Sequence, residues 1–169
     1  MIDHISLMNR ARLQKRQARD VSVTKDALEL FEKCKDDSLF LSGVVLYWAE
    51  GTRLNKNYRK YQLAFTNSDS NLVRFYCTFL KRYFKNIDTK DWRVGLFLYP
   101  DIKPEEAIYY WASILDVSSK QFIKSQILSG NIKHNKKLEF GTCCLYVNSK
   151  DACLSMQAWI DAICGLMRR

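Results

Sequence analysis

One carboxylate at the end of an apolar run is the side chain best placed for chemistry. Glu50 follows the apolar run 39–49 and precedes Gly51, so we expect it at the end of a helix that is buried on all sides. Gly43 and Ala49 are small enough to let a second helix pack closely. Two such carboxylates side by side would share divalent cations such as Mg²⁺, which polarise a phosphate and activate water. Glu50 is therefore the candidate catalytic residue and metal ligand, and the alternative is that it merely ends the helix.

Two long stretches of the chain are basic and contain no acid. The first lies between Gly51 and Ser68 and includes a strand-like run at 60–66, where polar and apolar residues alternate. The second lies between Val117 and Leu138, and strand-like runs at about 120–127 and 138–147 flank the polar stretch at 129–137. We expect two basic β-hairpins whose side chains enter the major groove of duplex DNA, whereas two solvated basic loops would not explain the matched absence of acids. The predicted DNA-binding residues are Arg53, Lys56, Arg59, Lys60, Gln62, Lys120, Lys124, Lys133, His134, Lys136 and Lys137.

The overall charge favours the same kind of partner. Among 169 residues, 27 are Lys or Arg and 18 are Asp or Glu, which gives a net charge of +9. A polyanion such as nucleic acid suits this balance. The stretch from Asn9 to Arg19 holds five of the basic residues and no acid, and it is either an arm along a phosphate backbone or a solvated helix.

The same composition gives expectations about compartment. The first residues lack the pattern of a secretory signal, and the longest apolar run has about half of the roughly 20 residues that a membrane helix needs. We expect an intracellular, cytoplasmic protein without a membrane partner. The six cysteines have no metal-like spacing and are expected to be reduced core residues.

The pattern of elements predicts an α+β fold with an internal repeat. Residues 1–35 form a basic arm and a first helix, and residues 36–169 form one domain. Within that domain we expect two helix-strand-strand-helix half repeats, at about 36–99 and 100–169, around a central pair of helices. The matched segments are Tyr47-Trp48-Ala49 with Tyr110-Trp111-Ala112, and Phe65-Thr66-Asn67-Ser68 with Tyr146-Val147-Asn148-Ser149.

The segment Gly43-Val44-Val45-Leu46-Tyr47-Trp48-Ala49-Glu50-Gly51 resembles the nonapeptide that names the LAGLIDADG homing endonucleases. The segment Phe65-Thr66-Asn67-Ser68-Asp69 also resembles divergent bacterial and phage members of this family. The resemblance implies that the nonapeptide helix packs against a second copy, in the same chain or in a dimer partner. Each helix ends in an acid, and the two acids hold Mg²⁺ between the scissile phosphates. It further implies a basic residue near the metals, for which Lys60, Lys120 and Lys124 are candidates.

The chain departs from the family pattern in its second half. Ser113 stands at the position that matches Glu50, and Ile114 stands where Gly51 would be. A monomer with an internal dyad would therefore lack one metal-binding acid, whereas a homodimer through residues 43–51 would restore two copies of Glu50.

Two functions follow from the resemblance. The chain is expected to bind a specific duplex site, either as a Mg²⁺-dependent endonuclease or as a catalytically degenerate regulator of transcription. RNA binding is an alternative, although the aromatic residues fall mainly on predicted helix faces. A small-molecule enzyme is disfavoured because His4 and His134 lie in polar surroundings, and because no phosphate-binding glycine loop or nucleophile elbow is present.

Overall fold

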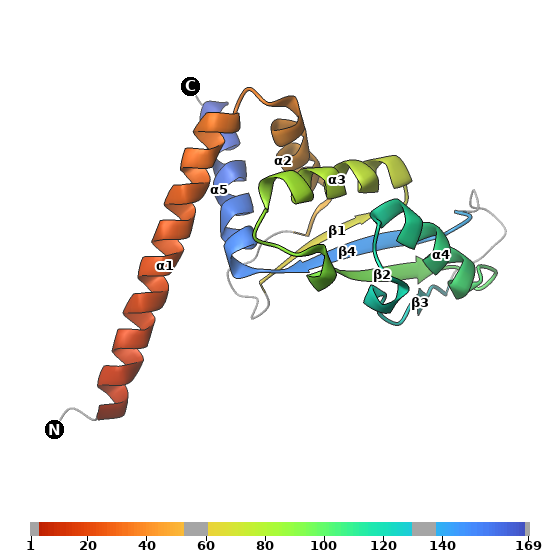
Figure 1. The fold of residues 1–169 in the computed structure, drawn as a ribbon, viewed down its shortest axis with the longest axis horizontal. Helices are drawn as coiled ribbons and strands as arrows, with labels where there is room; N and C mark the ends of the chain where they lie inside the picture. The colour runs from red at the N-terminus through yellow and green to blue at the C-terminus, as the bar shows by residue number, and fades with distance from the viewer. Residues whose placement is uncertain (1–3, 53–60, 130–137, 168–169) are drawn as a thin grey trace.

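The computed structural model describes residues 4–52, 61–129 and 138–167 and shows an α+β fold (Figure 1). A long N-terminal helix leads into a sheet with helices on one side. None of the described helices is long and apolar enough to span a membrane. In order, the elements are α1 (His4–Cys34), α2 (Ser38–Glu50), β1 (Gln62–Asn67), α3 (Ser70–Tyr83), η1 (Thr89–Asp91), β2 (Arg93–Leu98), α4 (Pro104–Leu115), η2 (Ser119–Gln121), β3 (Gln126–Ile127), β4 (Thr142–Asn148) and α5 (Lys150–Leu166).

Short polar side chains fix where three of the helices begin. Asp37 caps α2 by accepting hydrogen bonds from the backbone N–H groups of Leu39 and Phe40 at 2.9 and 3.3 Å. Asp69 caps α3 in the same way, and Ser149 accepts from the third residue of α5. These side chains satisfy N–H groups that have no partner within the helix.

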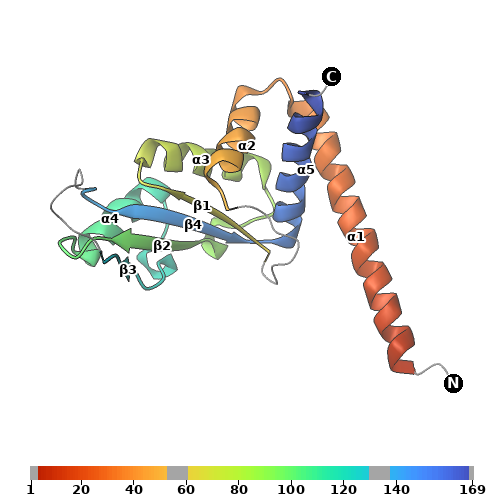
Figure 2. The same cartoon turned by 180° about the vertical axis from the view of Figure 1, so that it is seen from behind.

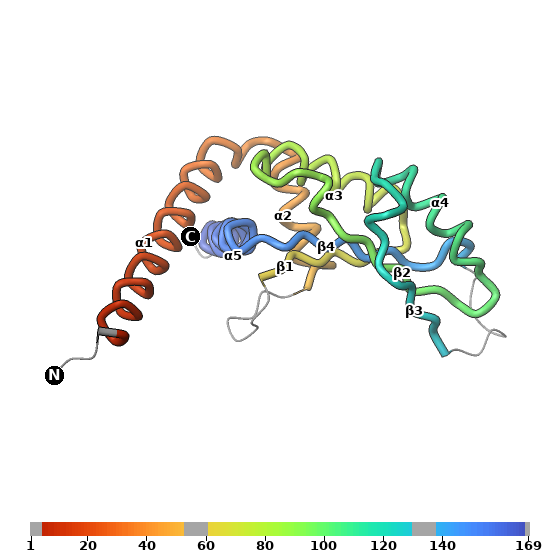
Figure 3. The backbone as a smooth tube through the Cα atoms, turned by 60° about the horizontal axis from the view of Figure 1, so that its bottom comes forward, coloured from red at the N-terminus to blue at the C-terminus, as the bar shows by residue number. Residues whose placement is uncertain are grey.

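The strands form one sheet in the order β1-β4-β2-β3. β4 is antiparallel to both β1 and β2, and β3 runs parallel to β2. Helices α2, α3 and α4 lie on one side of the strands, and Figure 3 shows no described helix on the other. We call these sides the covered face and the open face.

The core lies between the covered face and the helices. Phe65 of β1 stacks on Tyr76 of α3 with ring centroids 4.3 Å apart, and Phe79 of α3 contacts Phe40 of α2 at 6.4 Å. Trp159 of α5 meets Phe40 edge to face at 5.0 Å. The aromatic residues on helix faces are thus largely core residues, as expected from their spacing.

The C-terminal half of α1 belongs to this core as well. Ala27 and Phe31 are buried, and the indole N–H of Trp159 donates to the carbonyl of Ala27 at 2.8 Å. Figure 2 shows α1 and α5 side by side, with the N-terminal part of α1 continuing beyond α5. The C-terminal half of α1 thus packs on the same core as α2 and α5.

The described part of one chain does not contain a central pair made by α2 and α4. α3 lies between α2 and α4 and packs against both (Figure 1). The two Tyr-Trp-Ala segments also face differently: Tyr47 is buried and Trp48 exposed in α2, whereas Trp111 is buried in α4. The sheet combines β1 and β2 from residues 36–99 with β3 and β4 from residues 100–169, so the two stretches do not form separate halves.

The predicted hairpin of residues 120–127 with 138–147 is wrong. β3 pairs with β2, while β4 inserts between β1 and β2. The first predicted strand is redirected by local hydrogen bonds, whereas the position of β4 depends on the whole core. A capping box between Ser118 and Gln121 turns the chain into η2, and the apolar positions of β4 need the centre of the sheet to be buried.

Helix α2 is not buried on all sides, contrary to the prediction. Val45 is 46% exposed and Trp48 is 45% exposed, and they lie three residues apart on one outward face. Ala49 is exposed next to them. An apolar sequence pattern gives no information on whether the surface is covered by the chain itself or by another molecule.

Candidate nucleic-acid interface

Side chains alternate between the two faces of the sheet along each long strand. On β1, Leu63 and Phe65 point into the core, which directs their neighbours to the open face. The same alternation applies to β4 and β2. The open face therefore carries Gln62, Ala64 and Thr66 from β1, Thr142, Cys144, Tyr146 and Asn148 from β4, and Arg93, Gly95 and Phe97 from β2. None of these residues is acidic.

The polar groups at one end of the open face are held in place. The side-chain amide of Gln62 donates to the side-chain oxygen of Asn148 at 2.7 Å, across the paired strands β1 and β4. Next to Asn148 along the same face, the ring of Tyr146 lies over Gly95. A Cβ atom at Gly95 would be 3.0 Å from this ring, so the glycine gives it room.

Tyr146 keeps its proton at neutral pH. Partial burial raises the pKa of its phenol, and a hydrogen bond with the Cys144 side chain raises it further. The single O–H is directed to Cys144, and the hydroxyl oxygen can still accept a hydrogen bond. Thr66 reaches the same sulfur from β1, with 2.9 Å between its hydroxyl oxygen and Cys144 Sγ.

Arg93 is the cation that the structure adds to the predicted set. It starts β2, is exposed, and pairs in register with Tyr146 of β4. Its Nη1 donates to the backbone carbonyls of Trp92 at 2.8 Å and Lys90 at 3.1 Å, which orients the guanidinium. The signal available in the sequence was its place in the polar phase of an otherwise apolar strand.

Lys120 and Lys124 lie along the other edge of the sheet. Both are exposed, and the chain between them is joined to β2 by a hydrogen bond from the Ile123 N–H to the Val94 carbonyl at 2.8 Å. The predicted residues Arg53, Lys56, Arg59, Lys60, Lys133, His134, Lys136 and Lys137 lie outside the described residues.

The first predicted hairpin is described only at its ends. Gly51 forms an antiparallel bridge with Phe65, and the Thr52 N–H donates to the Ala64 carbonyl at 2.8 Å. The chain therefore leaves α2 alongside β1.

Glu50 is the last residue of α2 and is exposed. Among the described residues it has no hydrogen bond or ion pair. Within the same part of the chain, no group of three or more His, Cys, Asp or Glu side chains could hold a metal ion. Lys124 lies near β3, which is separated from β1 by roughly 14 Å across the sheet. One chain therefore does not bring Lys124 next to Glu50.

The two glycines of the α2 segment lie against side chains of the same chain. A Cβ at Gly43 would lie 2.2 Å from Phe79 Cδ2, so Gly43 permits close packing on α3 of the same chain. Gly51 has a φ of −80°, which any residue adopts. A Cβ there would lie 2.5 Å from the ring of Tyr47, whose hydroxyl donates to the Thr52 carbonyl at 2.8 Å. Ala49 is the small residue on the outward side.

Ser113 is the residue that matches Glu50 in the predicted repeat. Ser113 is exposed on α4, and its hydroxyl donates to the Tyr110 carbonyl one turn earlier at 2.7 Å.

Comparison with protein-family models, with curated proteins and with solved structures gave no match to this chain.

Proposed function

We propose that this protein binds double-stranded DNA in a sequence-specific manner through the open face of its sheet. The observation that carries the proposal is the composition of that face. Its side chains are small, polar, aromatic or basic, and they include no carboxylate in a sheet that is densely apolar on its other side. The net charge of +9 supports the same partner.

The chemistry of the face suits the edges of bases. Arg93 has free guanidinium N–H groups, which match the acceptors of guanine in the major groove. Gln62 and Asn148 carry amides, the side chains that pair with adenine. Because Gln62 and Asn148 already hydrogen-bond to each other, their orientation is fixed before binding. Lys120 and Lys124 would contact phosphates at the edge of the sheet.

We further propose that the scaffold is LAGLIDADG-like and that α2 is its nonapeptide helix. The exposed apolar face of Val45, Trp48 and Ala49 supports pairing of α2 with a second copy of the chain. Such a homodimer would bring two copies of Glu50 together at the C-terminal ends of two helices, where the helix dipole favours a cation. One chain alone supplies a single carboxylate, so the residues present fit Mg²⁺ only in the dimer.

In that dimer the two carboxylates would hold Mg²⁺, which supplies Lewis-acid activation of a phosphate and of water when bound. The protein's own groups would position the duplex across the paired open faces. A regulator that binds without cutting is the second candidate. It is favoured if α2 stays unpaired, because Ser113 cannot replace the missing acid.

The experiment is selection from a random duplex pool in Ca²⁺, followed by incubation of the selected site with Mg²⁺. Enrichment of one site, with cutting that Glu50→Gln abolishes and Glu105→Gln leaves intact, supports the endonuclease. Enrichment without cutting supports the regulator. Failure to enrich a duplex, or displacement of the duplex by single-stranded RNA of any sequence, would overturn the proposal.

The oligomeric state is measured alongside by sedimentation. Trp48→Glu introduces a charge on the exposed face of α2 and is expected to yield monomers that still bind DNA but do not cut it. Tyr109→Glu places the same charge on α4, where Tyr109 is 82% exposed, and is expected to change neither property.

A further inference from the structure

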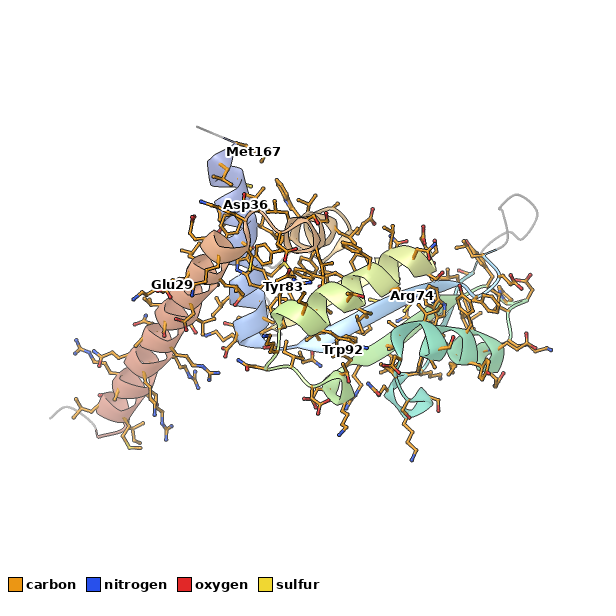
Figure 4. All side chains as sticks on the ribbon, turned by 45° about the horizontal axis from the view of Figure 1, so that its top comes forward. Glu29, Asp36, Arg74, Tyr83, Trp92 and Met167 are labelled. Atoms are coloured by element: carbon orange, nitrogen blue, oxygen red, sulfur yellow. The ribbon has the colours of Figure 1, made fainter. Side chains whose placement is uncertain are left out.

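The N-terminal part of α1 is a projecting helix with no tertiary cover. Every residue from Ile5 to Arg19 is exposed. We call this part the arm; its 15 residues span about 22 Å of helix. Figure 4 shows its side chains, many of them tipped with nitrogen, extending into space beyond α5.

The arm leaves the body at a defined place. Arg19 pairs with Asp151 at 2.7 Å, and Asp20 pairs with Lys150 at 2.6 Å, both at the first turn of α5. Towards the C-terminus, α1 packs on α5 through Ala27 and Phe31. Towards the N-terminus, no described element contacts it.

The face of α1 that packs on the body changes character at this point. At 100° per residue, Arg12 and Arg16 fall on the same side of the helix as Val23 and Ala27. This side of α1 is apolar where it lies against α5. The same side carries Arg12 and Arg16 in the part of α1 that extends past the N-terminal end of α5. Neither arginine has a hydrogen bond or ion pair with a described residue, and the arm contains no acid.

The arm also extends towards the open face. In Figure 3, the C-terminal end of α1 lies at the level of the helices, and its N-terminal end lies past the level of the strands, in the direction of the open face. A duplex on the open face would have the arginine stripe beside it.

We infer that the arm is a second DNA contact, a helix whose Arg12 and Arg16 bind the phosphate backbone next to the duplex segment that the sheet holds. The inference rests on the proposed function. It adds the arm to the open face as a second surface that contacts the duplex.

The chain offers a matched control on the same helix. Arg10 and Lys25 fall on the opposite side of α1 from Arg12 and Arg16, and both are exposed. The double variants Arg12→Gln/Arg16→Gln and Arg10→Gln/Lys25→Gln remove the same charge. Net charge therefore changes alike, and the lost cations of the control point away from the arginine stripe. Lys25 lies C-terminal to the arm, and its replacement also removes an exposed ion pair with Glu29 at 3.9 Å.

The test measures duplex affinity of the full chain against salt concentration. The slope of log K against log salt is negative, and losing two phosphate contacts reduces its magnitude by about 1.8. The affinity advantage of the parent over Arg12→Gln/Arg16→Gln should therefore shrink by about 12-fold between 50 and 200 mM salt. The control pair is expected to keep the parent slope. Equal slopes for the two double variants would overturn the inference.

Two further outcomes separate this inference from the proposed function. If Arg93→Gln weakens binding and Arg12→Gln/Arg16→Gln does not, the sheet binds DNA and the arm does not. Absence of duplex binding by the parent overturns both.

Amide hydrogen exchange provides a readout without substitution. Arm amides should exchange quickly in the free protein, because a short helix without packing is marginal in water, and slow down when duplex is added. Protection that rises with protein concentration in the absence of DNA would mean that a second copy covers the arm, which contradicts the inference.

Discussion

The two faces of the sheet share the same strands but differ in the size and polarity of their side chains. The covered face is built from large apolar side chains such as Phe65 and Leu96, which are almost completely buried against α3 and its neighbours. The open face presents Gln62, Thr66 and Arg93 and small residues between them. A substitution on the covered face should therefore change stability, whereas one on the open face should change binding.

The largest expected effect comes from two adjacent residues that point to opposite faces. Phe65→Ala removes a ring with no exposed surface and should lower the free energy of unfolding by about 3–5 kcal/mol. Thr66→Val keeps the side-chain volume and should lower it by less than about 1 kcal/mol. Urea denaturation measures both. Similar losses at the two positions would contradict the difference between the faces.

A glycine pair sharpens the comparison on the covered side. Gly43→Ala places a methyl group against Phe79 and should destabilise the protein by about 1–3 kcal/mol, even though alanine favours a helix. Gly165→Ala in α5 meets nothing within 4 Å and should be neutral or stabilising by up to about 1 kcal/mol. Thermal unfolding of both variants is the measurement. A stabilising Gly43→Ala would show that α2 and α3 are not in close contact.

The open face is tested by exchanging one cation. Arg93→Gln should leave the free energy of unfolding within about 0.5 kcal/mol of the parent. It should weaken binding of the selected duplex by about 1–3 kcal/mol, because Arg93 is proposed to bind the edge of a guanine. Lys103→Gln, at the start of α4 on the covered side, is the control and should leave that affinity unchanged. An unchanged affinity for Arg93→Gln would remove Arg93 from the interface.

The smallest effect is a pH dependence on the covered side. The pKa of Asp37 lies below its ordinary value, first because the Tyr83 hydroxyl donates to it at 2.7 Å and then because it caps α2. A lowered pKa means that the stabilisation is present above about pH 4 and is lost as the pH falls through the folded value. Asp37→Asn should unfold more easily at pH 7 and show a weaker loss of stability towards pH 2. Denaturant melts at several pH values measure this. The same acid sensitivity in both proteins would contradict the role of Asp37.

Local features of this fold follow from the sequence. Asp37, Asp69 and Ser149 cap helices, and such a side chain acts within three residues of its own position. The apolar spacing of α3 and α4 likewise predicts which of their faces are buried. These decisions depend on neighbours in the chain.

Strand pairing and the exposure of α2 do not follow in this way. β4 lies between β1 and β2, although the segment nearest to it in sequence forms β3. That choice depends on burying Leu145 and Val147 in the centre of the sheet, a property of the whole core. Trp48 and Trp111 occupy matching tripeptides and yet have opposite exposure, so the tripeptide alone does not decide which of them is buried.

The residues of the candidate site likewise fall into those placed by local pattern and those placed by strand pairing. Gln62 lies on the open face as expected from alternation, and Glu50 ends its helix as expected. Arg93 and Tyr146 were missed, because only the pairing of β2 with β4 brings them together.

The most direct test of DNA binding by the open face is a chemical-shift map of backbone and side-chain amides on titration with the selected duplex. We expect the largest changes at Gln62, Arg93, Tyr146 and Asn148, and little change along α3 and α4 on the covered side. Changes confined to α3 and α4, or no change at saturating duplex, would contradict the proposed interface.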